Sequence, residues 1–166
     1  MKGKNEQKVA LVTGGSQGIG RSIAEAFAEK GYAVAIFSRT EADVKEAAGG
    51  ISAKGSICEG HALDVSDFEA VSSAFRAVAE KRGRLDVLVT CAGVYGPIGA
   101  LEENDPAAWE QAIRINLCGT MFAVRAAIPF MKRQSSGCII TLAGGGVGGP
   151  SIKPNFSSYI SSKFAV

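Results

Sequence analysis

The chain of 166 residues has 46% hydrophobic residues, 20% charged residues and a formal net charge of +2, which is typical of one soluble globular domain with its own core. The only dense basic run, at 81–84, is interpreted as a solvated helix end, which argues against nucleic-acid binding. Residues 1–8 lack an apolar signal core and no apolar stretch approaches membrane-spanning length, so we expect a cytoplasmic protein without membrane contact.

The first elements alternate between strand and helix. The apolar run Val9–Thr13 predicts a strand, and Gly18–Lys30 predicts a helix with its apolar residues on one face. Gly31 is expected to end that helix before a second strand at Ala33–Phe37.

A hydroxyl followed three residues later by a carboxylate marks the next helix start. Thr40 and Asp43 have this spacing and predict a helix that begins there. Gly49-Gly50 weaken the helix, and Gly55 is expected to end it before a third strand at Ser56–Ala62.

The same spacing recurs after the third strand. Ser66 and Glu69 form a second capping box, which predicts a helix to about Lys81. The continuous apolar run Leu85–Cys91 is typical of a strand that is buried on both faces of a parallel sheet.

The last third of the chain contains one long helix, one strand and one short helix. Asp105-Pro106 predicts the start of the long helix, with Asp as the N-cap, and Pro129 is expected to bend or end it. Cys138–Leu142 predicts the fifth strand, the glycine-rich stretch Gly144–Gly149 is expected to be mobile, and Ser157 or Ser158 begins the final helix.

Five alternations of strand and helix predict a doubly wound parallel α/β sheet with right-handed crossovers, a Rossmann-like fold spanning residues 1–166. The chain ends shortly after its last helix begins, which leaves the fifth strand as an exposed edge. We therefore expect one dinucleotide-binding domain that is incomplete at its C-terminus and lacks the last strands and helices of the fold.

The four cysteines and the single histidine form no metal-binding pattern. Cys58, Cys91, Cys118 and Cys138 are widely spaced in apolar segments, without a CxxC pair. We expect no bound metal and interpret the cysteines as reduced, buried thiols. His61 falls inside a predicted strand and is interpreted as structural rather than catalytic.

The most informative motif is the glycine-rich turn between the first strand and the first helix. It reads Thr13-Gly14-Gly15-Ser16-Gln17-Gly18-Ile19-Gly20. Backbone amides and the positive end of the helix dipole at such a turn bind phosphate, and glycine lets a pyrophosphate approach closely. Taken alone, the same residues are also compatible with a simple tight turn.

Several motifs together make the chain resemble the short-chain dehydrogenase/reductase family over nearly its full length. They are Thr13-Gly14-x-x-x-Gly18-x-Gly20, Asp64-Val65, Cys91-Ala92-Gly93, Asn116 and Tyr159-x-x-x-Lys163. The resemblance implies an NAD(P)(H)-dependent oxidoreductase that interconverts a carbonyl and an alcohol by hydride transfer. The implied catalytic residues are Tyr159, Lys163 and Asn116. The candidate cofactor-binding residues are Gly14, Ser16, Gln17, Gly18, Ile19, Gly20, Ser38, Arg39, Thr40, Asp64, Val65, Ala92, Gly93, Tyr159 and Lys163.

The spacing of the tyrosine and the lysine suits acid–base chemistry. Residues i and i+4 share a helix face, so Tyr159 and Lys163 are expected to point into one cleft, where the ammonium would lower the phenol pKa. The resemblance further implies that Lys163 holds the nicotinamide ribose, that Asn116 positions a water for proton relay, and that Asp64 and Val65 hold the adenine edge.

Two departures from the family pattern are visible. The family has a serine after the fifth strand that hydrogen-bonds the substrate carbonyl, but Ala143 and Gly144 lack a hydroxyl. Ser151 could replace it only if its loop folds inward. The usual Asn-Asn pair before Ala-Gly is Thr90-Cys91, which puts local rigidity beside the cofactor in doubt.

The end of the second strand bears on the choice of cofactor. It reads Ser38-Arg39-Thr40, without the acid that would accept from the ribose 2′-hydroxyl of NAD. The guanidinium and two hydroxyls suit a 2′-phosphate, so we expect NADP(H) in preference to NAD(H). An exposed arginine near a helix start is the alternative.

The expected partners are a small-molecule carbonyl or alcohol substrate and, for a full-length parent, a second copy of the chain. Helices four and five of the family usually form a homodimer bundle, and Ala107, Ala108 and Ala112 would allow close packing. Two other functions stay open, namely a dinucleotide-binding module without turnover, acting as a sensor or scaffold, and a purely structural α/β module.

Overall fold

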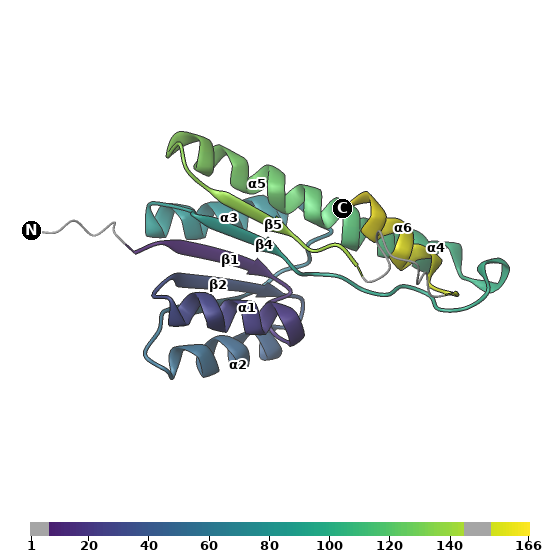
Figure 1. Ribbon diagram of the computed structural model, residues 1–166, viewed down its shortest axis with the longest axis horizontal. Coiled ribbons are helices and arrows are strands. Elements are labelled where there is room, and N and C mark those ends of the chain that lie inside the picture. The colour runs from purple at the N-terminus through teal and green to yellow at the C-terminus, as the bar shows by residue number, and fades with distance from the viewer. Residues whose placement is uncertain (1–6, 145–153) are drawn as a thin grey trace, which may run out of the picture.

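The computed structural model describes residues 7–144 and 154–166 and contains one five-stranded parallel sheet (Figure 1). The strand order is β3-β2-β1-β4-β5, as expected for a Rossmann-like fold. The strands are β1 Val9–Thr13, β2 Ala33–Ser38, β3 Cys58–Ala62, β4 Val87–Thr90 and β5 Cys138–Thr141. Among the described strands β5 forms one edge, and its Ile140 is partly exposed there.

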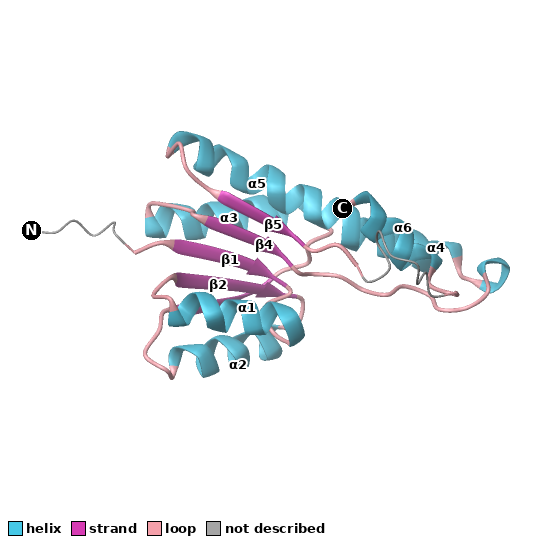
Figure 2. Ribbon diagram, viewed as in Figure 1, coloured by secondary structure: helices cyan, strands magenta, loops and turns pink. Residues whose placement is uncertain are grey.

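Helices cover both faces of this sheet (Figure 2). The helices are α1 Gly18–Glu29, α2 Glu41–Ser52, α3 Phe68–Arg82, η1 Leu101–Glu103, α4 Pro106–Ile113, η2 Arg114–Cys118, α5 Gly119–Arg133 and α6 Ser157–Ala165. The first two helices pack on one face, and α3 and α5 pack on the other. The segment that carries α4 and α6 extends beyond the carboxyl ends of the strands (Figure 1).

Alternating side chains of the strands supply the two halves of the core. Leu11 and Phe37 face α3 and α5, where Phe75 and Ala127 are completely buried. Val12 lies on the other face, in the cluster with α1 and α2. Both faces of the central strands are therefore covered, as the apolar runs in the sequence predict.

The structure confirms one predicted helix cap and moves another. Asp105 caps α4 by accepting hydrogen bonds from the amides of Ala107 and Ala108 at 3.1 and 3.3 Å. The predicted cap of α3 at Ser66 is wrong, because the Ser66 hydroxyl donates to Asp64 Oδ1 at 2.8 Å. Asp67 takes its place and accepts from the amide of Ala70.

The second helix begins where its sequence predicts, but its cap and its glycines behave differently. It starts at Glu41 as expected, but the Thr40 hydroxyl makes no capping hydrogen bond. Gly49 and Gly50 stay helical, and the helix continues to Ser52. Its buried apolar face therefore outweighs the weak helix propensity of the two glycines.

The long helix is continuous from Pro106 to Arg133 but changes its winding at η2, a π-helical turn. Pro129 does not end it, because the buried Ala127 and Met131 hold the flanking turns against the core. This stretch of 28 residues is apolar and long enough to cross a membrane, so the expectation that none approaches that length is wrong. One such helix is weak evidence of a membrane span, since core helices of soluble proteins can have the same length and apolar composition.

Small differences in length separate the other elements from their predicted ranges. Strand β3 begins at Cys58 rather than at Ser56, and β4 is shorter at both ends than Leu85–Cys91. Helix α6 begins at Ser157, as predicted. Most of the glycine-rich stretch Gly144–Gly149 and the candidate donor Ser151 lie outside the described residues.

The chain reverses its direction of winding between two neighbouring strands. From β1 it proceeds outward through β2 and β3, then returns to place β4 on the opposite side of β1. In open α/β sheets ligands bind at the carboxyl ends of the strands at such a point. The fold therefore places the glycine-rich turn after β1 next to the segment that follows β4.

Candidate functional site

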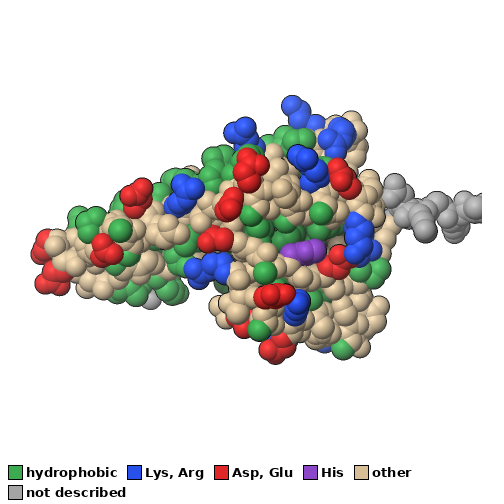
Figure 3. All heavy atoms as spheres, turned by 180° about the vertical axis from the view of Figure 1, so that it is seen from behind, with side chains coloured by type: hydrophobic (Ala, Val, Ile, Leu, Met, Phe, Trp, Pro, Cys, Tyr) green, Lys and Arg blue, Asp and Glu red, His purple; other side chains and the backbone are tan. Residues whose placement is uncertain are grey.

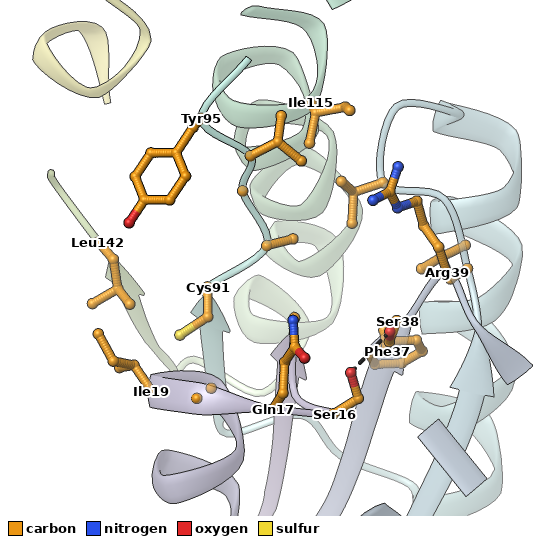
Figure 4. A pocket seen from close by; sticks show the side chains of 18 of the residues that line it. Ser16, Gln17, Ile19, Phe37, Ser38, Arg39, Cys91, Tyr95, Ile115 and Leu142 are labelled. Atoms are coloured by element: carbon orange, nitrogen blue, oxygen red, sulfur yellow. Dashed lines mark hydrogen bonds between the residues drawn. The ribbon is translucent and has the colours of Figure 1, made fainter. Parts of the chain in front are cut away.

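A cleft of about 510 Å³ opens at the carboxyl ends of β1, β2, β4 and β5 (Figure 4). The structure brings most of the predicted cofactor residues into it. These are Gly14, Ser16, Gln17, Gly18, Ile19, Gly20, Ser38, Arg39, Val65, Ala92, Gly93, Tyr159 and Lys163. Figure 4 shows Arg39 at one end of the cleft and Tyr95 at the other, with the glycine-rich turn between them.

Three of the predicted site residues do not line this cleft. Thr40 is the N-cap of α2, and Asp64 accepts from the amide and the hydroxyl of Ser66 at 2.9 and 2.8 Å. Asn116 is fully buried behind the wall of the cleft. Both bonds from Ser66 go to Asp64 Oδ1, so only Oδ2 is left to accept from an adenine edge.

The glycine-rich turn is built by close backbone packing. Gly14 has a left-handed φ of +67°, and its amide donates to the carbonyl of Phe37 at 2.8 Å. A Cβ on Gly20 would lie 2.2 Å from the carbonyl oxygen of Gly14, which no side chain tolerates. These contacts fix the start of α1, whose first-turn amides have no intrahelical partners and are left for an anion.

The end of β2 carries a polar and positively charged group. Ser16 donates to the Ser38 hydroxyl at 3.0 Å, and Arg39 is exposed beside them. Burial acts to raise the pKa of Asp64, but the hydrogen bonds from Ser66 and the positive charges of Arg39 and Arg114 outweigh it and lower that pKa. The Asp64 carboxylate is therefore ionised at neutral pH and faces two cations.

Helix α6 supplies Tyr159 and Lys163. The Lys163 side chain is 6% exposed and its Nζ donates to the carbonyl of Leu142 at 2.9 Å. Burial lowers the pKa of Lys163, opposed in part by the neighbouring Cys91 thiol. The pKa of Tyr159 is raised by burial and by the neighbouring phenol of Tyr95, so the expected lowering by the lysine is wrong for the chain alone. The Lys163 ammonium donates to the Leu142 carbonyl, and it does not contribute to the pKa of Tyr159.

The side chain of Asn116 joins three segments around the cleft. Its Oδ1 accepts from the amide of Val94 at 2.8 Å, and its Nδ2 donates to the Val94 carbonyl and the Ser162 hydroxyl, both at 2.9 Å. Thr120 donates to the Asn116 carbonyl at 2.8 Å. Both amide protons are thus used within the protein, and one lone pair of Oδ1 remains for a water.

Gly144, one of the two positions after β5 where the family has a serine, is closely packed by other side chains. A Cβ on Gly144 would lie 2.9 Å from Lys163 Cβ and Cγ and 3.0 Å from Tyr159 Cε1. Gly144 therefore fills a position where the two α6 side chains leave no room. Ala143 lines the cleft and is exposed, but its methyl group offers no hydrogen bond.

The motif after β4 is held by Thr13. The Thr13 carbonyl accepts from the amide of Cys91 at 3.1 Å, and its hydroxyl accepts from the amide of Ala92 at 3.3 Å. The buried Thr90 hydroxyl has no partner among the described residues. Two backbone amides, rather than the family's paired asparagines, thus connect this segment to the glycine-rich turn.

The cysteines are less buried than the sequence suggests. Cys138 is exposed on the edge strand β5, and Cys58, Cys91 and Cys118 are half-buried, so the expectation that all four are buried is wrong. All four are free thiols, and burial raises the pKa of Cys58 and of Cys91 to about 11. Both of these thiols are therefore protonated at neutral pH.

Residues that the sequence did not predict as cofactor-binding or catalytic also line the cleft. They are Phe37, Leu63, Cys91, Val94, Tyr95, Ile115, Leu142 and Ala143. Position alone could have indicated Tyr95, because it follows closely after a parallel strand, where binding residues gather. No local pattern in the sequence indicates the direction of its ring.

Two further expectations concern His61 and Ala112, which do not line the cleft. His61 stacks on Phe37 with ring centroids 5.3 Å apart and lies in β3, and burial lowers its pKa, with a further contribution from Lys81. Ala112 is buried in the subunit, where a Cβ on Gly96 would touch it at 2.7 Å, so it is not free to pack against a second copy. Acidic and basic side chains are interspersed over the face drawn in Figure 3.

Comparison with known proteins agrees with this geometry. The pattern of the family described as short chain dehydrogenase matches residues 8–166. An uncharacterized oxidoreductase of Staphylococcus saprophyticus is 38% identical over 97% of this chain and 68% of its own length. A 3-oxoacyl-[acyl-carrier-protein] reductase of Staphylococcus aureus is also 38% identical, over 96% of this chain and 64% of that protein.

Solved structures show the same fold with either cofactor. A metagenomic short-chain oxidoreductase in complex with NADP is 32% identical, with a TM-score of 0.89, over 98% of this chain and 73% of that one. An NAD⁺-bound xylitol dehydrogenase is 30% identical, with a TM-score of 0.89, over 95% of this chain and 60% of that one. The chain spans between 58% and 68% of the length of the first three curated relatives.

Proposed function

Because the chain belongs to the short-chain dehydrogenase family, we propose that it carries the cofactor-binding and catalytic part of an NADP(H)-dependent oxidoreductase that interconverts a carbonyl and an alcohol. One observation carries this proposal. Tyr159 and Lys163, one helical turn apart, share a cleft with the glycine-rich turn and Arg39. An acid–base group and a dinucleotide cradle are the two parts that such a reaction requires.

The residues of the cleft fit a phosphorylated dinucleotide. Gly18, Ile19 and Gly20, the first residues of α1, line the cleft, and their backbone amides would bind a pyrophosphate there. Arg39 with Ser38 would hold a 2′-phosphate, since no carboxylate lines this end of the cleft among the described residues. The bound cofactor supplies or accepts the hydride at its nicotinamide ring.

The protein's own contribution is to move a proton at the substrate oxygen. In reduction the Tyr159 hydroxyl donates its proton to the carbonyl oxygen as the carbon accepts the hydride. A raised pKa keeps this phenol protonated at neutral pH, in the form that can donate a proton to a carbonyl oxygen. Lys163, fixed by the Leu142 carbonyl, would hold the ribose hydroxyls beside it.

Asn116 serves the site mainly as a positioning residue in this proposal. By clamping Val94 and Ser162 it ties the segment after β4 to α6, which carries the tyrosine. The water relay that the resemblance implies would use the remaining lone pair of its Oδ1, near the Lys163 ammonium.

A dinucleotide-binding module without turnover is the second candidate. It is favoured by Ala143 and Gly144, neither of which offers a hydroxyl to the substrate oxygen. For the longer protein we propose a cytoplasmic homo-oligomer that uses α4 and α5, where Met121 and Ile128 are exposed.

A carbonyl panel separates the two candidates. The purified chain is incubated with NADPH and, in turn, ethyl acetoacetate, cyclohexanone and acetoin, and alcohol products are quantified by gas chromatography. We expect at least one alcohol from the wild type and none from Tyr159→Phe, with NADPH binding retained in both. Cofactor binding without product from any carbonyl favours the non-catalytic module, and equal product from both proteins refutes the role of Tyr159.

A further inference from the structure

We propose that the phenol of Tyr95 replaces the missing serine and donates the second hydrogen bond to the substrate oxygen, an inference that rests on the proposed function. Tyr95 follows β4 and lines the cleft together with Tyr159, Lys163 and Leu142. Its ring centroid lies 5.0 Å from that of Tyr159, at an interplanar angle of 54°. The two phenols thus stand side by side at the end of the cleft opposite Arg39.

The hydroxyl of Tyr95 is available for a ligand. The residue is 60% exposed, and within 7–144 and 154–166 its hydroxyl makes no hydrogen bond. Figure 4 shows its ring directed from the segment after β4 into the cleft, with the hydroxyl on the side of Leu142. A large aromatic residue in such an exposed place, with an unpaired donor turned inward, is suited to contact a substrate.

The backbone that carries this ring is held on both sides. The Ser158 hydroxyl, buried in α6, donates to the carbonyl of Tyr95 at 3.1 Å. Asn116 binds both backbone groups of Val94, the preceding residue. Gly96, the following residue, has a φ of +71°, and a Cβ there would lie 2.4 Å from Ser158 Oγ. These contacts fix Tyr95 relative to α6, the helix that carries Tyr159.

No side chain at Gly144 could take the same role. Lys163 and Tyr159 occupy the space where a Cβ would extend, so a serine there would displace the catalytic pair. Ala143 has room for a hydroxyl because it is exposed to the cleft. The structure therefore offers both the present donor and a position at which a serine could restore the lost one.

The role requires a neutral phenol that donates while Tyr159 transfers its proton. A Tyr95 phenolate would repel a Tyr159 phenolate, and this neighbour effect contributes to the raised pKa of Tyr159. The Tyr95 hydroxyl carries a proton that no described residue accepts, so it can donate to the substrate oxygen. It stabilises the oxygen as negative charge develops there, without losing its own proton.

The test is binding of 2,2,2-trifluoroethanol to the chain saturated with NADP⁺, followed by fluorine NMR line broadening. The oxygen of this alcohol takes the place of the substrate oxygen, and the alcohol resists oxidation. We expect Tyr95→Phe to raise its dissociation constant by about five-fold or more, because one hydrogen bond is lost while the ring remains. Tyr32→Phe is the matched control and should leave the constant unchanged, since Tyr32 packs on Phe27 outside the cleft.

A rescue variant separates donation from packing. Ala143→Ser in the Tyr95→Phe background should restore most of the lost affinity, which a purely structural role of Tyr95 would not allow. Equal constants for wild type and Tyr95→Phe, absence of trifluoroethanol binding to the NADP⁺-loaded wild type, or failure of the rescue would overturn the assignment. Absence of NADP⁺ binding to the wild type would overturn the proposed function itself, and the inference with it.

Discussion

The contact between Gly20 and Gly14 is the tightest constraint on the cofactor cradle. A Cβ at position 20 would lie 2.2 Å from the Gly14 carbonyl oxygen and 2.8 Å from its carbon, and both are backbone atoms. The overlap that Gly20→Ala creates therefore cannot be relieved by rotation of a side chain. The glycine-rich turn and the start of α1 have to move apart.

The change in the free energy of unfolding caused by Gly20→Ala follows from two opposing effects. Overpacking of a core typically costs about 1–3 kcal/mol, and a backbone overlap this short places the cost at the upper end. Alanine in a helix regains about 1 kcal/mol relative to glycine. We expect a net loss of about 2 kcal/mol in the free energy of unfolding. Displacement of the first-turn amides should weaken NADPH binding by about tenfold or more.

Urea unfolding followed by far-UV circular dichroism measures the first effect, and NADPH fluorescence titration measures the second. Gly49→Ala is the matched control, because Gly49 is helical and exposed and has no atom within 4 Å of its added Cβ. It should gain about 0.5–1 kcal/mol and keep the NADPH affinity. If Gly20→Ala were as stable as Gly49→Ala and bound NADPH equally well, the close-packed cradle would be refuted.

Three other predictions concern the rest of the fold and the cleft. Arg39→Asp should shift the ratio of NADPH to NADH dissociation constants toward NADH, and an unchanged ratio would exclude Arg39 as the phosphate clamp. Asn116→Ala should lower the free energy of unfolding by about 1–3 kcal/mol, because the half-buried backbone groups of Val94 lose their partner; a stability equal to wild type in urea contradicts this. Asp86→Asn should cost about 1–2 kcal/mol at pH 7, since the carboxylate accepts from the Val9 amide and from Arg84. Burial acts to raise the pKa of Asp86, but these bonds lower it overall. The stabilisation is therefore present above the unfolded-state value of about 3.9 and is lost as pH falls through the lower folded-state pKa; a difference in stability between wild type and Asp86→Asn that does not shrink as the pH is lowered below about 3.9 would contradict the assignment.

The sheet and its cradle could be predicted because their signals are local. The run Val9–Val12 is apolar and completely buried, and Gly20 after it is required by a contact with Gly14 within the same turn. The family motifs then identified Tyr159 and Lys163, which the structure places in the same cleft. The pattern of apolar residues, the residue types in turns and the spacing of motifs therefore predict most of the architecture.

What the sequence missed depends on contacts between distant segments. Ser66 has the spacing of an N-cap, but its hydroxyl donates to Asp64, so Asp67 caps the helix instead. The pKa of Tyr159 depends on Tyr95, 64 positions earlier in the chain, and on burial that no local pattern encodes. The survival of the helix through Pro129 is likewise decided by packing against the core.

Fluorescence titration of the purified chain with NADPH, and separately with NADH, tests the central claim most directly. The account predicts saturable binding of both reduced cofactors in the cleft, with the smaller dissociation constant for NADPH because Arg39 and Ser38 receive the 2′-phosphate. Absence of saturable binding of either cofactor would contradict the account, because the glycine-rich turn would then not be a dinucleotide site.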